Sequence, residues 1–122
     1  FCSEIKENIF HIFWECNVTQ NFWLSIIDWI RNYEIFLPFS AKEVILGVSE
    51  DSVNSKTVNN ILLLFKYYIY KCRCKSVLPT KYGGIEYLKY WIKIEKYSVC
   101  FLTPTQKIKL DQKWQLLEAA LN

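Results

Sequence analysis

Glycine and proline are scarce in this chain, and their scarcity most restricts the folds open to it. Three glycines and three prolines are spread over 122 residues. A fold with many short strands would need more of them, because these residues make most tight turns. Apolar residues make up 52% of the chain, enough for one core in a single domain. We therefore predict an all-α protein, an irregular bundle of about five to six helices.

Apolar residues at helical spacing locate these helices. Helices are predicted over residues 5–14, after Asn17, over 40–47, 56–75 and 85–98, and from Thr103 onward. One face of 56–75 is expected to be buried through Val58, Ile61, Leu62, Phe65, Ile69 and Cys72. Other expected buried positions are Val44, Ile45, Leu46, Leu88, Ile92, Ile108, Leu110, Trp114, Leu117 and Leu121. No stretch alternates regularly enough to predict a strand.

Helix-start signals support three of these helices. Asn17, Ser40 and Thr103 are good N-cap residues, and each has a Gln or Glu three positions later. Gly47 is expected to end the helix that Ser40 begins. A break is predicted around Pro79 and Gly83-Gly84, because proline and glycine interrupt helices.

Charge is unevenly distributed along the chain. Residues 1–53 carry three basic and eight acidic side chains, a net −5, whereas residues 54–122 carry twelve basic and four acidic ones, a net +8. The polar segment 48–55 is predicted to be a loop and a joint between the acidic and basic parts. The basic half is suited to a polyanion, and the alternative is that its lysines only solvate helix surfaces.

Cys2, His11 and Cys16 form the most distinctive motif, with eight residues and then four residues between them. Zinc prefers thiolate and imidazole ligands in a set of four. The three residues would make three quarters of such a site, and we expect the fourth ligand to be a cysteine upstream of Phe1. The chain would then be a fragment, with a partial zinc-knuckle-like motif at 1–16 and a helical region at 17–122. Alternatively, all three are ordinary core residues.

Basic residues interleave with tyrosines on one predicted helix, and a stripe of lysines follows on the next, which suggests contact with nucleic acid. The residues concerned are Lys66, Tyr67, Tyr70, Lys71, Arg73 and Lys75 on the first helix and Lys89, Lys93 and Lys96 on the next. Lysines neutralise phosphates and tyrosines stack on unpaired bases. If the two groups form one continuous face, nucleic acid is favoured. A large exposed aromatic patch would instead favour a structural role or a protein partner.

Several other classes of function are not expected. The chain has one histidine, no glycine-rich phosphate loop and no cluster of carboxylates, so we predict no enzymatic activity and no small-molecule substrate. No apolar run approaches the roughly 20 residues that cross a bilayer, so no membrane contact is expected. Five cysteines, an odd number, favour reduced thiols in an intracellular protein.

The same residues resemble the extreme C-terminal region of reverse transcriptases from LINE-type non-LTR retrotransposons. The similar segments are Phe1-Cys2, His11-Ile-Phe-Trp-Glu-Cys16, Gln20-Asn-Phe-Trp23, Ile45-Leu-Gly47, Lys66-Tyr-Tyr-Ile-Tyr-Lys-Cys72, Tyr87-Leu-Lys89, Ile94-Glu-Lys96 and Lys113-Trp114. Their order and spacing follow the family over nearly the whole chain.

The resemblance implies a function and a ligand set. Cys2 would match the second cysteine of the family's zinc motif, His11 its histidine and Cys16 its last cysteine. The module would assist RNA or DNA binding during target-primed reverse transcription, next to an upstream polymerase domain, in the cytoplasm and nucleus. The intact parent would be an RNA-directed DNA polymerase with an endonuclease. A structural or protein-docking module, or an inactive transposon remnant, is the alternative.

Overall fold

A computed structural model describes residues 8–32, 40–49 and 53–121, and within these ranges the chain forms helices and no strand. The all-α prediction is confirmed. The elements in chain order are a π-helix η1 (His11–Glu15), α1 (Asn17–Arg31), α2 (Ala41–Leu46), α3 (Val53–Cys74), α4 (Lys81–Tyr97), a 3₁₀ helix η2 (Ser98–Phe101) and α5 (Pro104–Leu121).

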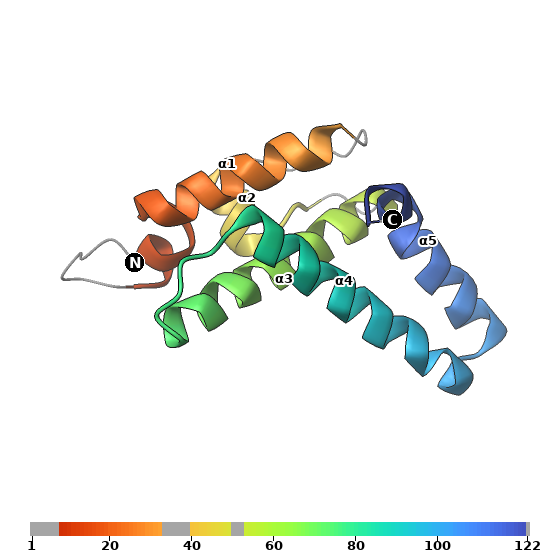
Figure 1. The fold of residues 1–122 in the computed structure, drawn as a ribbon. Coiled ribbons are helices and arrows are strands. Elements are labelled where there is room, and N and C mark those ends of the chain that lie inside the picture. Colours follow the sequence, from red (N-terminus) through yellow and green to blue (C-terminus); the bar gives the residue numbers. More distant parts are fainter. Residues whose placement is uncertain (1–7, 33–39, 50–52, 122) are drawn as a thin grey trace.

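The longest helix, α3, organises the molecule. It runs through the middle, α4 crosses it, and α5 and η1 also contact it (Figure 1). Helices α4 and α5 form a hairpin, because α5 turns back after η2 and packs against α4. The turn of this hairpin lies at the opposite side of the molecule from η1 (Figure 1).

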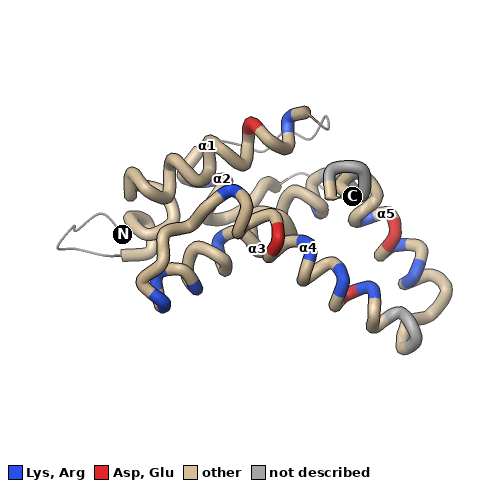
Figure 2. Tube along the Cα trace, in the orientation of Figure 1, with Lys and Arg blue, Asp and Glu red and all other residues tan. Residues whose placement is uncertain are grey.

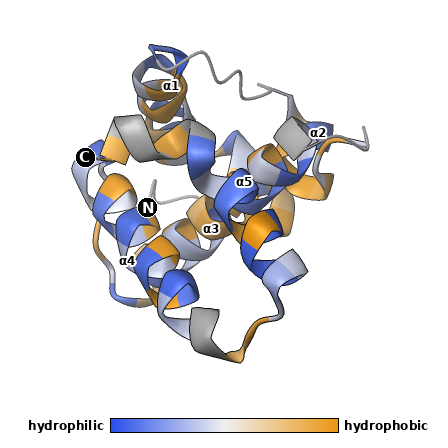
Figure 3. Cartoon of the chain, turned by 90° about the vertical axis from the view of Figure 1, so that its right-hand side faces the viewer, coloured by the Kyte–Doolittle hydropathy of each residue, from blue (hydrophilic) through white to orange (hydrophobic). Residues whose placement is uncertain are grey.

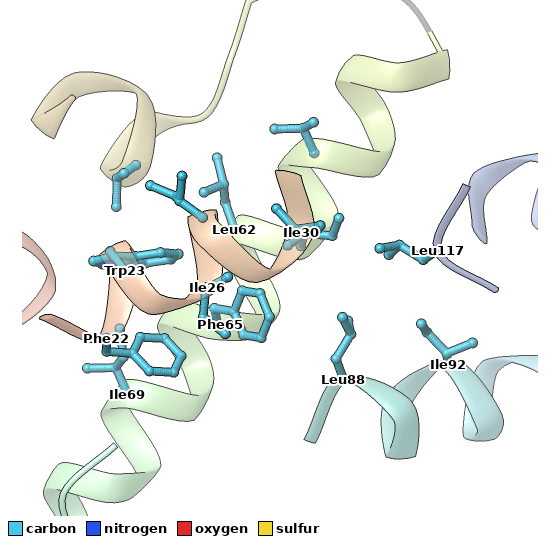
Figure 4. Close-up of a cluster of buried hydrophobic side chains, with 14 of the residues drawn as sticks. Phe22, Trp23, Ile26, Ile30, Leu62, Phe65, Ile69, Leu88, Ile92 and Leu117 are labelled. Carbon is cyan, nitrogen blue, oxygen red and sulfur yellow. The ribbon is translucent and has the colours of Figure 1, made fainter. Parts of the chain in front are cut away.

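The predicted apolar face of α3 is the centre of the core. Its six residues are all buried, from Val58 to Cys72. Five of them, from Val58 to Ile69, pack in one cluster with Phe22, Trp23, Ile26 and Ile30 of α1, Leu88 and Ile92 of α4, and Leu117 of α5 (Figure 4). Val44 of α2 joins the same cluster, so all five α-helices contribute to one core.

Two of the three predicted helix caps are confirmed. The Ser40 hydroxyl accepts a hydrogen bond from the Glu43 backbone N–H and donates one to the Glu43 carboxylate. Thr103 and Gln106 exchange the reciprocal pair of bonds at the start of α5. The prediction at Asn17 is wrong, because Asn17 is already the first residue inside α1 and Cys16 holds the cap position. The chain enters α1 directly from η1, one residue earlier than the motif indicated.

Gly83 and Gly84 do not break a helix, contrary to the prediction. They lie in the first turn of α4, where Thr80 caps the Gly83 N–H. A Cβ on Gly84 would come within 2.9 Å of the Phe22 ring. Glycine is used here because α4 and α1 approach closely, and this requirement comes from tertiary packing.

Three further details differ from the sequence predictions. The first helix is only partly α-helical, since residues 11–15 adopt the wider π form. Leu46 and Ile108, expected to be buried, are exposed. Helix α3 begins at Val53, so the predicted loop 48–55 ends earlier than expected. The Asn59 side chain exchanges hydrogen bonds with the backbone of Val48 and holds the described part of this loop against α3.

In the ranges that the structure covers, no helix is both long and apolar enough to span a membrane.

Candidate nucleic-acid interface

Tyr67, Tyr70 and Lys71 form an exposed cluster on α3. Tyr67 and Tyr70 are 46% and 49% exposed, and their rings stack with centroids 6.5 Å apart and planes 23° apart. The Lys71 ammonium lies 5.2 Å from the centroid of the Tyr67 ring, within the range of a cation–π interaction. The cluster thus presents two aromatic rings and one cation to solvent.

A layer of partly buried aromatic rings supports this cluster from the α4 side. Tyr87 contacts Tyr67 and Tyr68 with ring centroids 6.3 and 5.7 Å apart, and Lys71 Nζ lies 5.7 Å from the Tyr87 ring. The Tyr68 hydroxyl accepts a hydrogen bond of 3.1 Å from the Thr80 N–H. These contacts hold the exposed rings in place, so little side-chain entropy would be lost when a ligand stacks on them.

Tyr70 of the cluster and the supporting Tyr68 and Tyr87 carry no charge near neutral pH. A hydrogen bond with Cys74 raises the pKa of Tyr70, and burial raises the pKa of Tyr68 and of Tyr87. A raised phenol pKa keeps the neutral form dominant at any physiological pH. The neutral rings therefore do not repel an anionic ligand.

Lys66 has a different environment from the other basic residues of α3. Its Nζ donates a hydrogen bond of 2.7 Å to the Ile45 carbonyl, near the C-terminus of α2. A cation is favourable there, because the last carbonyls of a helix carry partial negative charge. Burial lowers the pKa of Lys66. Lys66 thus ties α2 to α3 and is not part of the exposed cluster.

Arg73 and Lys75 follow at the end of α3. Arg73 is half-buried, whereas Lys75 is exposed just beyond the last helical residue. Figure 2 shows basic positions gathered at this end of the helix. Lys71 and Lys75 are spaced by four residues and lie on the same side of α3. Both are exposed, so they are the cations that this end of α3 presents to solvent.

Lys89, Lys93 and Lys96 lie on a separate surface. Tyr87 contacts α3, and Trp91 continues the same flank of α4 four residues later. At 3.6 residues per turn, the three lysines follow the opposite flank. Lys89 lies 3.5 Å from the carboxylate of Glu86. Figure 2 shows the basic positions of the second half of α4 well apart from those at the end of α3. The two predicted basic groups do not form one continuous face.

His11 and Cys16, two of the three predicted zinc ligands, are buried at the ends of η1. The Cys16 N–H donates a hydrogen bond of 2.9 Å to the His11 carbonyl, so the two backbones are adjacent. His11 Nδ1 is 3.8 Å from a Glu15 carboxylate oxygen. Cys2 lies outside the described residues, and within residues 8–32, 40–49 and 53–121 no group of three or more His, Cys, Asp or Glu side chains could hold a metal ion.

Helix α1 holds η1 rigidly in place. The Thr19 hydroxyl donates a hydrogen bond of 2.6 Å to the Ile12 carbonyl, and Trp23 Nε1 donates one of 3.0 Å to the Phe13 carbonyl. These carbonyls belong to the last turn of η1, where a helix has no intrahelical donors. Thr19 and Trp23 supply the missing donors, which fixes the corner where His11 and Cys16 lie.

Two features of the structure were missed by the sequence reasoning. Glu95 of α4 accepts hydrogen bonds from Lys113 Nζ and from Trp114 Nε1 of α5, both at 2.6 Å. This contact joins α4 to α5, and no local pattern indicates it. The second feature is an exposed apolar stripe formed by Tyr90, Ile94 and Tyr97 of α4 and Phe101 of η2. The spacing of these residues is visible in the sequence and could have revealed the stripe.

No protein-family model matches this chain, and no solved structure shows significant similarity to it.

Proposed function

We propose that this chain is a non-catalytic module that binds single-stranded nucleic acid through Tyr67, Tyr70 and Lys71. The observation that carries the proposal is the pair of stacked, half-exposed tyrosine rings with an ammonium group beside them. An unpaired base can stack on such a ring, and a lysine can neutralise the adjoining phosphate. Base pairs in a duplex hide their faces, so single strands suit this surface better.

The cellular role follows from the resemblance of the sequence to LINE-type reverse transcriptases. In that setting the module would assist the binding of template RNA or target DNA during target-primed reverse transcription, in the cytoplasm and nucleus. Its covalent neighbour would be the polymerase domain of the parent protein. Because the two basic groups do not form one continuous face, the proposal loses that support and depends on the Tyr67, Tyr70 and Lys71 cluster alone.

Zinc belongs to the same proposal only as part of the intact parent. His11 and Cys16 offer the imidazole and thiolate donors that zinc prefers, and their backbones are adjacent. They are two of the four ligands that a closed structural site needs. The remaining donors would be Cys2 and a cysteine upstream of Phe1. A zinc titration of a chain extended upstream tests this ligand set, and stoichiometric binding that is lost in His11→Ala supports it.

Fluorescence anisotropy with a labelled RNA and a labelled single-stranded DNA, across a series of salt concentrations, tests the proposed contact. The variant Tyr67→Ala/Tyr70→Ala should weaken binding about tenfold or more, because stacking contributes roughly 1–3 kcal/mol per base. Lys71→Gln should reduce the slope of log affinity against log salt by about 1.

Tyr82→Ala and Lys109→Gln are matched controls, since both residues are exposed and lie outside the cluster. A Lys→Gln triple variant at Lys89, Lys93 and Lys96 shows whether the second basic group participates. Affinity that does not respond to salt, or equal losses in the cluster and control variants, would refute the proposal.

A further inference from the structure

The outer face of α4 carries an apolar stripe that no other part of the described chain covers. Tyr90, Ile94, Tyr97 and Phe101 are 59%, 39%, 73% and 87% exposed. Tyr90, Ile94 and Tyr97 are spaced by four and three residues, so they follow one line along α4, and Phe101 follows in the 3₁₀ helix η2 just beyond the end of α4. Figure 3 shows hydrophobic colour at the connection between α4 and α5.

This stripe makes α4 apolar on two opposite sides. Leu88 and Ile92 are buried in the core, and the stripe lies on the reverse side of the helix. Single exposed apolar residues are common and need no explanation. Helix α4 is not apolar all round, since Lys89, Lys93 and Lys96 lie between its two apolar sides. A line of large exposed side chains opposite the buried face nevertheless indicates a partner that covers it.

The spacing and the neighbouring charges define the partner. A repeat of four and three residues is the seam along which two helices pack in a coiled coil. Lys93 lies exposed beside the stripe, and the partly exposed Lys89, which pairs with Glu86, and Lys96 lie on the same flank. A helix packed on this seam would place its flanking residues next to these lysines, where acidic side chains are favoured. We propose that the stripe binds an amphipathic helix of another protein, with acidic residues along its flanks.

Other occupants fit the surface less well. A second copy of this chain packed antiparallel on the same stripe would bring the same lysines toward one another, which costs free energy. Unpaired bases stack on aromatic rings, but Ile94 offers no ring and the seam extends through it. The proposed helix site shares no residue with the Tyr67 cluster, because the site lies on α4 and η2 and the cluster lies on α3.

The test uses a fluorescently labelled synthetic peptide of about 21 residues, with leucine at the two seam positions of each heptad and glutamate at the flanking positions. One control peptide has lysine in place of glutamate, and another has the acidic sequence scrambled. The acidic peptide should bind the full chain saturably and at least about tenfold more tightly than either control, a difference of about 1.4 kcal/mol. Equal binding of the three peptides, or none, would overturn the proposal.

Substitutions on α4 locate the binding site. Tyr97→Ala and Phe101→Ala should each weaken peptide binding about tenfold, as expected for aromatic residues at the centre of an interface. Tyr82→Ala is the matched control, because Tyr82 lies on the same helix, is 75% exposed and is outside the stripe. Circular dichroism should show unchanged helix content in all three variants. An equal loss in Tyr82→Ala would contradict the assignment.

Two further measurements separate the alternative occupants. A dimer detected by light scattering and abolished by Tyr97→Ala would identify a second copy as the occupant and overturn the proposal. Displacement of the peptide by single-stranded RNA in wild-type protein and in Tyr67→Ala/Tyr70→Ala alike would assign the stripe to nucleic acid and also overturn it. Retention of the peptide under both tests supports the helix site, whether or not the Tyr67 cluster binds nucleic acid.

Discussion

Replacing Glu95 tests the contact that joins α4 to α5. The Glu95 carboxylate accepts hydrogen bonds from Lys113 Nζ and Trp114 Nε1, and Trp114 is almost fully buried. In Glu95→Ala the indole N–H loses its acceptor while it remains away from water, which costs about 1–3 kcal/mol. Lys113 is partly exposed and can be hydrated, so its lost ion pair adds at most about 1 kcal/mol. We expect a total loss of about 1–4 kcal/mol, with a central value of about 2 kcal/mol.

Urea denaturation followed by circular dichroism measures this loss. With a slope of about 2 kcal/mol per molar, the midpoint should fall by roughly 1 M. Glu95→Gln keeps an acceptor for Trp114 and should lose no more than about 1 kcal/mol. Glu86→Ala is the control, because Glu86 pairs with Lys89 at the exposed surface and should change stability by less than about 0.5 kcal/mol. If Glu95→Ala and Glu86→Ala unfold at the same urea concentration, the reasoning is wrong.

Three further substitutions test the packing and the polar contacts. Gly84→Ala should destabilise the fold by about 1–3 kcal/mol in urea denaturation, because the added Cβ would lie 2.9 Å from the Phe22 ring. Helix propensity alone predicts a gain in stability, and such a gain would contradict the packing argument. Thr19→Val removes the hydroxyl that bonds an η1 carbonyl and should cost about 1–2 kcal/mol, measured the same way; an unchanged midpoint would show that the bond is dispensable. Burial lowers the pKa of Lys66 below its ordinary value of 10.5, so between the two pKa values the unfolded chain binds more protons at Lys66 than the folded chain does. The stability of the wild-type protein, compared with that of Lys66→Met, should therefore rise with pH over this window. Unfolding free energies at neutral pH and near pH 10.5 check this, and a relative stability that falls with pH would refute it.

Much of the fold could be predicted from local patterns. The face of α3 from Val58 to Cys72 was predicted correctly, because burial on one side of a helix imposes a 3.6-residue period on the sequence. The caps at Ser40 and Thr103 were predicted because they act within three residues. Gly83 and Gly84 were misread, because a Cβ on Gly84 would meet Phe22 of α1 and one on Gly83 would meet Tyr68 of α3, and both neighbours are distant in the sequence.

The candidate sites show the same division. The sequence identified Tyr67, Tyr70 and Lys71 as a possible nucleic-acid surface, and the structure brings their side chains together. It could not show that Lys66 is engaged with α2, because that hydrogen bond joins residues 21 positions apart. The prediction for zinc stays a prediction, since Cys2 lies outside the described residues.

The sequence by itself determined that this protein is helical, which face of α3 is buried, and where the helices capped by Ser40 and Thr103 begin. These properties depend on residues within a few positions of one another. Only the tertiary structure decided which flanks of α3 and α4 meet. Tyr87 packs against Tyr67 and Tyr68 at that crossing. The crossing turns Lys89, Lys93 and Lys96 away from α3 and leaves the stripe from Tyr90 to Phe101 exposed, because a helix that packs one flank on a neighbour must present the opposite flank elsewhere.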